Sequence, residues 1–393
     1  MNCDVFVTAD AAEGSIVQNQ LLADHVSIKL EFVMPSSDPL GSLSSNTIES
    51  RACSVSDSVS SGSEARASRI VQSTRCDGGL VDPSLPTPNF FVVGAAKAGT
   101  TSIHAYLSGH PQVFMSALKE PHYFASFEVS PEFDNFKPVI RDRADYHDLF
   151  HGSEEFLAIG EASPSYLCDP EASARIRSVI PHAKIIISLR NPVDRAFSAY
   201  LELFYEGKER RLFDEAVNFD LSRADKGWGR SAGYVELGLY ASQVESYLKV
   251  FGREQVLVIL FEDLVRNTGD VMQKIARFLG IDPARFPDSA FAKVHNPFEM
   301  TRGPIARAIL RSRPIRVWAK RIFPQGARTT FRDRFLFVKG RKPRLEDESR
   351  RALAALFAAD VERLERLLGR DLGILKTSAV IHSPAKLSTD IER

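Results

Sequence analysis

The chain has 393 residues, of which 44% are hydrophobic and 25% charged, a composition typical of a globular protein with a sizeable core. Its net charge is zero, so no global field recruits nucleic acid or an acidic membrane. The four cysteines form no CxxC pair and lack the spacing of zinc ligands, which favours free thiols in a reducing compartment. With no apolar run near ~20 residues and no signal-like start, we expect a cytoplasmic protein without a membrane span.

The first part of the chain differs from the rest in composition and in its pattern of apolar residues. Residues 1–85 are predicted to form a disordered, serine-rich extension, because the stretch from Ser36 to Ser73 lacks the apolar periodicity needed to bury a face. Within it, only the run from Ile28 to Met34 resembles a strand. We expect a single folded domain over residues 86–375 and a loose tail over 376–393.

Short apolar runs alternate with helical patterns through the folded part. Four buried strands are predicted, at Phe90–Val93, Leu157–Gly160, Ala183–Leu189 and Gln255–Phe261. Amphipathic helices are predicted at Val193–Gly207, Gly269–Leu279 and Glu346–Leu368. Strands alternating with helices predict an α/β fold, a parallel sheet flanked by helices on both faces. Residues 301–344 are basic, and we expect them to be irregular.

A glycine-rich loop with the sequence GAAKAGTTS connects the first strand to the helix after it. Its two glycines bracket four residues, as in the P-loop, and its small residues let backbone amides approach an anion. The start of the following helix adds a partial positive charge. We therefore predict a phosphate-binding strand-loop-helix that includes Lys97, Ala98, Gly99, Thr100, Thr101 and Ser102.

Two departures from the nucleoside-triphosphatase pattern bear on the chemistry. Thr100 stands where that pattern has lysine, and the strand through Leu189 ends in Arg190 where a magnesium enzyme has aspartate. These positions favour a site in which protein cations replace a metal. A metal-dependent kinase remains an alternative, as does a strand-to-helix turn that binds no ligand.

Arg190 follows the third strand, at the edge where open α/β sheets bind ligands, and Ser198 lies eight positions later. A structural ion pair is the alternative role for Arg190. Together with the glycine-rich loop, this spacing resembles the sulfotransferases that use 3′-phosphoadenosine-5′-phosphosulfate (PAPS), particularly the heparan-sulfate-type and related bacterial enzymes. In that family GxxKxGTT binds the 5′-phosphosulfate, and an arginine with a serine eight positions later binds the 3′-phosphate. The resemblance covers roughly Pro88 to Leu372 and implies PAPS as co-substrate, with no metal.

Two further segments resemble the same family. The stretch beginning at Leu237 is similar to its GxYxxxLxxW pattern, and the run beginning at Lys339 is similar to the KGR loop that closes over the 3′-phosphate. The resemblance therefore implies additional cofactor contacts from Tyr240, Lys339, Gly340 and Arg341. For the last three, a solvated basic loop is the alternative interpretation.

The acceptor needs a base, and the segment KEPHYF, which begins at Lys119, is similar to the family's KEPHFF, whose glutamate is the base. The resemblance implies Glu120 as the base, with His122 as the alternative. Lys97 would stabilise charge on the leaving phosphate. The GEASPSY segment from Gly160 to Tyr166 is similar to the family's EKTPxYF, but Ala162 replaces a lysine that helps to position the sulfuryl group. Lys97 is therefore expected to act as the sole catalytic cation.

The predicted function is transfer of a sulfuryl group from PAPS to a hydroxyl or amine. The resemblance favours a carbohydrate or glycoconjugate acceptor, and a small metabolite is the alternative. The rival classes are a P-loop kinase and a binding module that retains the fold without activity. We expect no nucleic-acid partner, and the sequence leaves the oligomeric state open.

Overall fold

The computed structural model describes residues 86–127, 139–223, 233–287, 290–291, 299–312, 318, 322, 331–340 and 342–373. The chain divides into two units, Met1–Ser73 and Thr74–Arg393, and every described residue belongs to the second. The predicted extension over 1–85, its strand-like run and the tail over 376–393 lie outside the described residues. Cys168 is a free thiol, as expected. None of the described helices is long and apolar enough to cross a membrane.

A five-stranded parallel sheet forms the centre of the described domain, which confirms the predicted fold class. The strand order is β2-β3-β1-β4-β5. The bounds are β1 Phe90–Gly94, β2 Val113–Met115, β3 Ala158–Ala162, β4 Lys184–Leu189 and β5 Val256–Leu260. The sequence did not indicate β2, because three residues are too few to show a strand period. It also ended the second strand too early, at Gly160.

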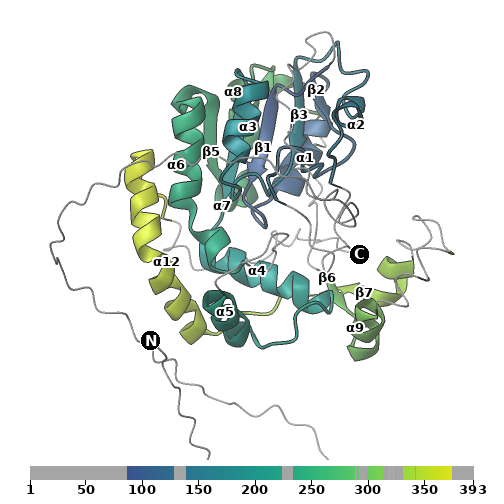
Figure 1. Ribbon diagram of the computed structural model, residues 1–393, viewed down its shortest axis with the longest axis vertical. Coiled ribbons are helices and arrows are strands. Elements are labelled where there is room, and N and C mark those ends of the chain that lie inside the picture. Colours follow the sequence, from purple (N-terminus) through teal and green to yellow (C-terminus); the bar gives the residue numbers. More distant parts are fainter. Residues whose placement is uncertain are drawn as a thin grey trace, which may run out of the picture. The chain divides into compact units, whose positions relative to one another are not determined.

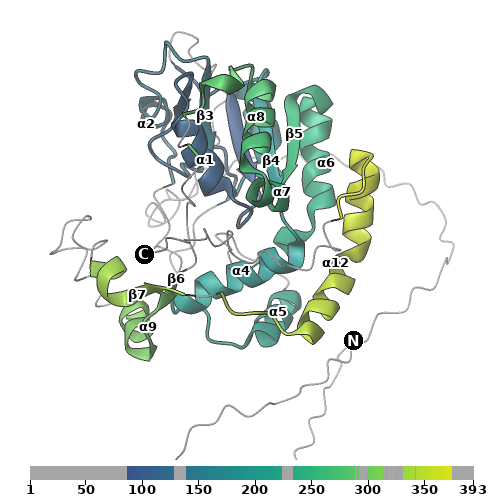
Figure 2. The same ribbon diagram turned by 180° about the vertical axis from the view of Figure 1, so that it is seen from behind.

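Helices cover both faces of the sheet, as Figures 1 and 2 show. The longer ones are α1 Thr100–Ser108, α3 Ala172–Val179, α4 Pro192–Tyr205, α5 Phe213–Ser222, α6 Tyr240–Phe251, α8 Thr268–Leu279 and α12 Asp347–Leu368. Shorter turns of helix are α2 Arg143–Asp148, α7 Phe261–Arg266, η2 Glu236–Gly238, η3 Arg253–Gln255 and η4 Pro283–Arg285. The three helices predicted in detail are confirmed to within two residues at each end.

Alternation along β1 separates two apolar cores. Phe91 and Val93 pack in the core that contains side chains of α3, α4, α6 and α12, whereas Phe90 and Val92 pack in the core that contains α1 and α8. Successive side chains of a strand point to opposite faces, so a continuous apolar run is what a sheet covered on both sides requires.

The basic stretch predicted to be irregular contains regular structure. Strands β6 Glu299–Thr301 and β7 Phe337–Lys339 pair antiparallel, and helix α9 Pro304–Arg311 and the π-turn η5 Arg332–Leu336 lie between them in sequence. Ala306, Leu336 and Phe337 form a small core of their own. The prediction was wrong because these contacts join positions about thirty to forty residues apart, which local periodicity does not reveal. In both views this group lies apart from the main sheet (Figures 1 and 2).

Candidate active site

The glycine-rich loop is held against the end of β4 by three hydrogen bonds. The Ala95 amide donates to the Ser188 carbonyl at 2.6 Å, and the Ser188 hydroxyl donates to the Ala98 carbonyl at 2.6 Å. The Arg190 guanidinium donates to the Lys97 carbonyl at 3.0 Å. Two of these bonds use loop carbonyls, those of Lys97 and Ala98, so these two carbonyl dipoles are turned toward β4. The loop is therefore anchored to the end of β4 at three points.

Gly99 is required at the end of this loop. Its φ is +83°, and a Cβ at this position would lie 2.8 Å from the Phe261 ring. No side chain caps the first turn of α1, which starts at Thr100, so this helix end offers its positive pole to an anion. The same Phe261 ring lies 4.6 Å from the Arg190 guanidinium. Because Gly99 has no side chain, the loop, the Phe261 ring and Arg190 can lie close together.

The Lys97 side chain forms an ion pair with Glu202. Its ammonium donates to Glu202 Oε1 at 2.8 Å, and the two side chains are 21% and 38% exposed. Glu202 lies on α4, one turn after the predicted phosphate ligand Ser198, which is partly buried. Sequence reasoning missed Glu202, because a glutamate on an amphipathic helix carries no signal of its partner 105 residues earlier.

Arg190 occupies the end of β4 as predicted. Burial lowers the pKa of its guanidinium, and the nearby carboxylates of Asp194 and Glu262 oppose that shift. The Tyr240 hydroxyl donates to the Arg190 carbonyl at 3.0 Å, and Tyr240 is completely buried. Tyr240 therefore holds the backbone of Arg190 in place. Its predicted contact with the cofactor stays a prediction.

A further lysine lies close to this arginine. The Lys342 ammonium is 5.7 Å from the Phe197 ring of α4. Although much of its side chain is exposed, partial desolvation and the neighbouring cations Arg190, Lys97 and Arg350 lower the pKa of Lys342 to about 7. Such a group of cations, repelling one another in the absence of an anion, is what a phosphate site requires.

Only part of the predicted KGR run lies among the residues that the structure describes. Gly340 follows β7, whereas the side chain of Lys339 and the whole of Arg341 lie outside the described residues. Lys342 immediately follows this run and was not among the predicted ligands. The sequence signal that would have found it is the same basic run, continued by one residue.

Both candidate bases lie on one short loop beside the end of β3. The Glu120 amide donates to the Ala162 carbonyl at 3.2 Å. Glu120 Oε1 accepts from the Lys119 ammonium, and Glu120 Oε2 lies 3.8 Å from His122 Nε2. The other ring nitrogen of His122, Nδ1, is 2.6 Å from Ser165 Oγ. The Glu120 carboxylate and the His122 ring therefore lie within ion-pair distance of each other.

The backbone of this loop is strained. Glu120 and His122 have φ values of +70° and +56°, a region that residues other than glycine rarely adopt, and Pro121 lies between them. Buried hydroxyls hold the strained turn. Ser163 Oγ accepts from the His122 amide at 3.2 Å, and the Tyr166 hydroxyl accepts from the Phe124 amide at 3.2 Å.

The segment that includes Ala162 supports the base loop from within the protein. Ala162 is completely buried in the core beside α1, so a long charged side chain has no room there. Glu161 is also fully buried, close to the hydroxyls of Tyr146, Ser163 and Tyr166 but outside good hydrogen-bond geometry. Burial raises the pKa of its carboxyl to about 7. Within this segment, the Ser165 hydroxyl contacts the ring of the candidate base His122.

The site elements lie at the carboxyl ends of three strands of the sheet. Strands β3, β1 and β4 are neighbours, and all run parallel. The base loop bonds to the end of β3, the Lys97 loop leaves β1, and Arg190 leaves β4. Along these strand ends the order is candidate base, loop lysine and arginine. The described residues contain no group of His, Cys, Asp and Glu side chains that could hold a metal ion.

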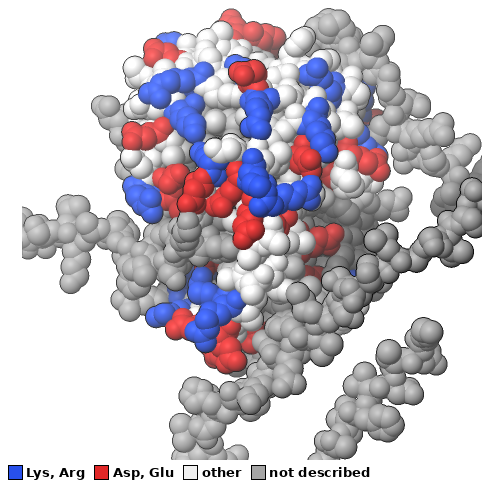
Figure 3. All heavy atoms as spheres, turned by 90° about the vertical axis from the view of Figure 1, so that its left-hand side faces the viewer, with Lys and Arg blue, Asp and Glu red and all other residues white. Residues whose placement is uncertain are grey.

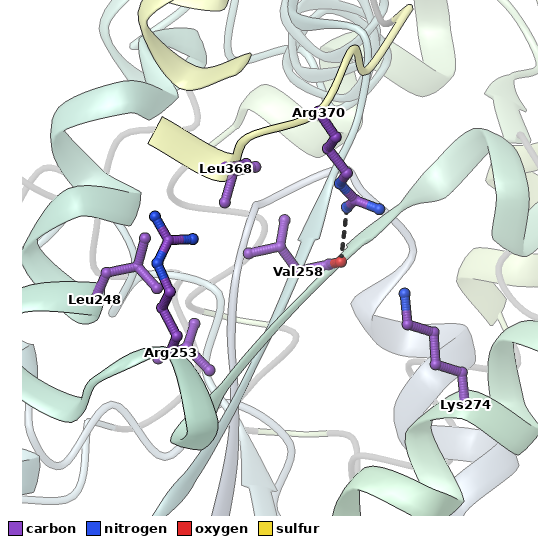
Figure 4. A pocket seen from close by; sticks show the side chains of 7 residues that line it. Leu248, Arg253, Val258, Lys274, Leu368 and Arg370 are labelled. Atoms are coloured by element: carbon purple, nitrogen blue, oxygen red, sulfur yellow. Dashed lines mark hydrogen bonds between the residues drawn. The ribbon is translucent and has the colours of Figure 1, made fainter. Parts of the chain in front are cut away.

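A separate cavity lies elsewhere, at the exposed edge of β5. Seven residues line it, among them Arg253, Val258, Lys274 and Arg370 (Figure 4). Arg370 donates to the Val258 carbonyl at 3.0 Å and so covers part of the strand edge. The volume of the cavity, about 150 Å³, is too small for a nucleotide cofactor. The cavity is therefore not part of the site.

Residues 87–298, just over half of the chain, match the family model described as "Sulfotransferase domain". The chain belongs to the sulfotransferase family. Among solved structures it is similar to a sulfotransferase from Alicyclobacillus acidocaldarius, with 35% identity and a TM-score of 0.58 over 74% of this chain and 100% of that one. The resemblance predicted from the loop and the arginine–serine spacing is confirmed.

Curated relatives include sulfotransferases that modify carbohydrates. Mouse carbohydrate sulfotransferase 15 is 29% identical over 276 residues, which cover 56% of this chain and 48% of that protein. Mouse heparan sulfate glucosamine 3-O-sulfotransferase 3A1 is 28% identical over 204 residues, covering 51% and 48%. The chain spans about half the length of the curated relatives that it matches.

Proposed function

We propose that this sulfotransferase moves the sulfuryl group of PAPS to a hydroxyl or amine of a carbohydrate or glycoconjugate. The observation that carries the proposal is that Glu120, Lys97 and Arg190 all lie at the ends of the neighbouring strands β3, β1 and β4. The matched relatives that act on carbohydrates support the acceptor class. A small metabolite remains the alternative acceptor, and cytoplasmic location stays a prediction.

The cation side of the site, formed by the Lys97 loop, Arg190 and Lys342, would bind the nucleotide. The loop from Lys97 to Ser102, with the uncapped start of α1, suits the 5′-phosphosulfate. Arg190, Ser198 and Lys342 suit the 3′-phosphate, because two or three cationic or hydroxyl donors can share its oxygens. Lys339, Gly340 and Arg341 remain proposed contacts in the same region. Protein cations would thereby supply the charge that a metal supplies in a kinase.

The base side of the site, formed by the loop that carries Glu120 and His122, would activate the acceptor. In the proposed step, Glu120 takes the proton of the acceptor hydroxyl as the acceptor oxygen forms a bond to sulfur. The bond between sulfur and the bridging phosphate oxygen breaks, and the electron pair stays on that oxygen. Lys97 stabilises the developing charge after leaving its partner Glu202. The product pair is the sulfated acceptor and the 3′,5′-bisphosphate.

Glu120 is favoured over His122 by the contacts of each side chain. His122 is bound on one ring nitrogen by Ser165 and faces Glu120 with the other, so it is placed to orient the carboxylate. The Glu120 carboxylate pairs with the Lys119 ammonium of the same loop. His122 remains the alternative base.

The test is turnover of labelled PAPS against a panel of glycans, glycolipids and small phenols, with EDTA present throughout. Transfer of label to a carbohydrate acceptor is the expected result. Transfer to phenols alone would replace the acceptor class. In a separate assay without EDTA, turnover of ATP with magnesium, together with no thermal stabilisation by the bisphosphate product, would contradict the proposed function and favour a kinase.

A further inference from the structure

Glu161 on β3 carries a carboxyl group that none of the proposed chemical steps uses. Its side chain is completely buried, and its position in the sheet lies beside Phe91 of β1. Acidic side chains normally lie at the surface, as on the face drawn in Figure 3, where they are interspersed with basic ones. Because a buried carboxyl is costly unless polar groups contact it, the neighbours of Glu161 indicate what it does.

Three buried hydroxyls lie close to the Glu161 carboxyl, those of Tyr146, Ser163 and Tyr166. Among the residues that the structure describes, neither carboxyl oxygen has a partner in good hydrogen-bond geometry, and the Tyr146 hydroxyl has none either. A hydroxyl proton rotates to suit its acceptor, and an ionised carboxylate only accepts. The cluster therefore gathers three donors around one acceptor.

Two of these hydroxyls also hold the base loop, residues 119–124. Ser163 Oγ accepts from the His122 amide at 3.2 Å, and Tyr166 Oη accepts from the Phe124 amide at 3.2 Å. Each hydroxyl has a single proton, which it can give to another acceptor while its oxygen receives the amide. The buried carboxyl beside them is placed to take both protons.

We propose that Glu161 is a positioning residue for the base loop. As a carboxylate it accepts the protons of Ser163 and Tyr166, and so turns their oxygens toward the two amides. The loop needs such support, because its backbone has positive φ values at Glu120 and His122. The role in catalysis rests on the proposed function, in which this loop carries the base, whereas the support of the loop does not.

The ionisation of Glu161 fits this role. Burial raises the pKa of its carboxyl to about 7, and the nearby hydroxyls of Tyr166, Tyr146 and Ser163 oppose that shift. The carboxylate is therefore present slightly above neutrality. A side chain that merely filled space could be replaced by glutamine, which has the same shape. Glutamine, however, brings an NH₂ group that must donate into a cluster that already consists of donors.

The experiment is amide hydrogen exchange, resolved to single residues, in the full chain of the wild type and of Glu161→Gln at about pH 8, where the carboxyl is ionised. The His122 and Phe124 amides should exchange at least about tenfold faster in the variant. Exchange in β4 and β5, away from Glu161, should stay unchanged. Tyr166→Phe lacks the oxygen that accepts from Phe124 and should produce the same loss at that amide.

The matched control is Glu209→Gln, the same change at another buried carboxylate that accepts from a tyrosine. Glu209 is 9% exposed, and its hydrogen-bond partners, Arg210, Arg211 and Tyr234, lie outside the base loop. The base loop of this control should exchange at the wild-type rate, and faster exchange there would overturn the proposal. Circular dichroism and melting temperature establish the folding of each variant.

A second variant, Glu161→Asp, keeps the charge but withdraws the carboxyl by one methylene. It should raise the exchange rate of the two amides by about threefold, less than Glu161→Gln does. Because it stays an acceptor and introduces no donor, it serves as the test if Glu161→Gln does not fold.

Turnover of labelled PAPS connects the loop to catalysis. In Glu161→Gln, kcat should fall at least about fivefold while the Kd of the bisphosphate product is unchanged, because the cation side of the site is untouched. In a protein that already carries Glu120→Gln, the same change should cost no further turnover, because Glu161 acts through the base. A purely structural role would lower the melting temperature without this dependence on Glu120.

The exchange and turnover results separate the two proposals. Wild-type exchange of the two amides in folded Glu161→Gln, or in Glu161→Asp where the first variant does not fold, would overturn the positioning role. A loss of kcat of equal size with and without Glu120→Gln would overturn its action through the base. Faster exchange in Glu161→Gln, together with no sulfuryl transfer by the wild type, would support the role of Glu161 and contradict the proposed function.

Discussion

The two halves of the site are built in different ways. On the cation side, the Lys97 loop is tied to β4 by bonds from Ser188 and Arg190, so the central sheet itself sets its position. On the base side, the strained turn at Glu120 is held by buried hydroxyls of Ser163 and Tyr166. The loop proposed to bind the cofactor is thus fixed by residues at the end of a core strand, whereas the loop proposed to activate the acceptor is fixed by side chains packed beneath it.

The largest expected effect comes from the base side. Glu120→Gln keeps shape and hydrogen bonding but cannot accept a proton, so turnover should fall about 10²–10⁴-fold while the bisphosphate product binds normally. Steady-state kinetics and calorimetry measure the two quantities. His122→Asn is the comparison variant. If it abolishes turnover while Glu120→Gln stays near wild type, the base has been misassigned.

Lys97→Ala tests the cation side at the leaving group. Charge on the bridging oxygen is greatest in the transition state, so turnover should fall by about 10²–10³-fold and cofactor affinity by much less. Comparing kcat with the calorimetric Kd separates the two effects. An equal loss in both would mean that Lys97 serves ground-state binding.

Arg190 should matter for affinity. Loss of charge-assisted bonds to the 3′-phosphate should weaken product binding in Arg190→Ala by about 10–10²-fold. Arg190→Lys should recover part of that loss, because a point charge cannot reproduce the guanidinium fork. Unchanged binding in Arg190→Ala by calorimetry would remove this residue from the site.

Glu202 sharpens the comparison, because it ties the loop lysine to α4. In Glu202→Gln no ion pair has to break when the cofactor arrives, so binding of the bisphosphate product should tighten by about two- to fivefold. Glu206→Gln, one turn later at the C-cap of α4 and paired with Lys208, is the matched control and should bind like the wild type. Weaker binding in Glu202→Gln would show that the pair positions Lys97 for the cofactor.

The smallest effect expected is a pH dependence from Lys342. Its lowered pKa, about 7, means that the ammonium is protonated below neutrality and increasingly neutral above it. Binding of a phosphate favours the protonated form, so affinity for the product should decline as pH rises through 7, with proton uptake on binding. Calorimetry in two buffers of different ionisation enthalpy measures that uptake. Lys342→Gln should lack it, and uptake equal to that of the wild type would assign the proton elsewhere.

Contiguous features of the site were predictable from the sequence. The loop from Gly94 to Ser102 follows β1, and Arg190 follows β4 with Ser198 two turns into the next helix. Short motifs reveal such features because they specify local backbone geometry. The parallel sheet was predictable for the same reason, since apolar runs and helical periods are local patterns. The charge of residues 302–344 is equally plain in the sequence, although a net charge of zero conceals it.

Other features were decided only by tertiary contacts. The partner of Lys97, the approach of Lys342 to Arg190 and the burial of Glu161 each join residues far apart in the chain. A glutamate looks the same in a sequence whether it faces water or a tyrosine cluster. Its role depends on desolvation and on the charges nearby, and these exist only once distant segments have packed together. For the same reason, composition alone could not show that Ile305 and Phe335 remain exposed.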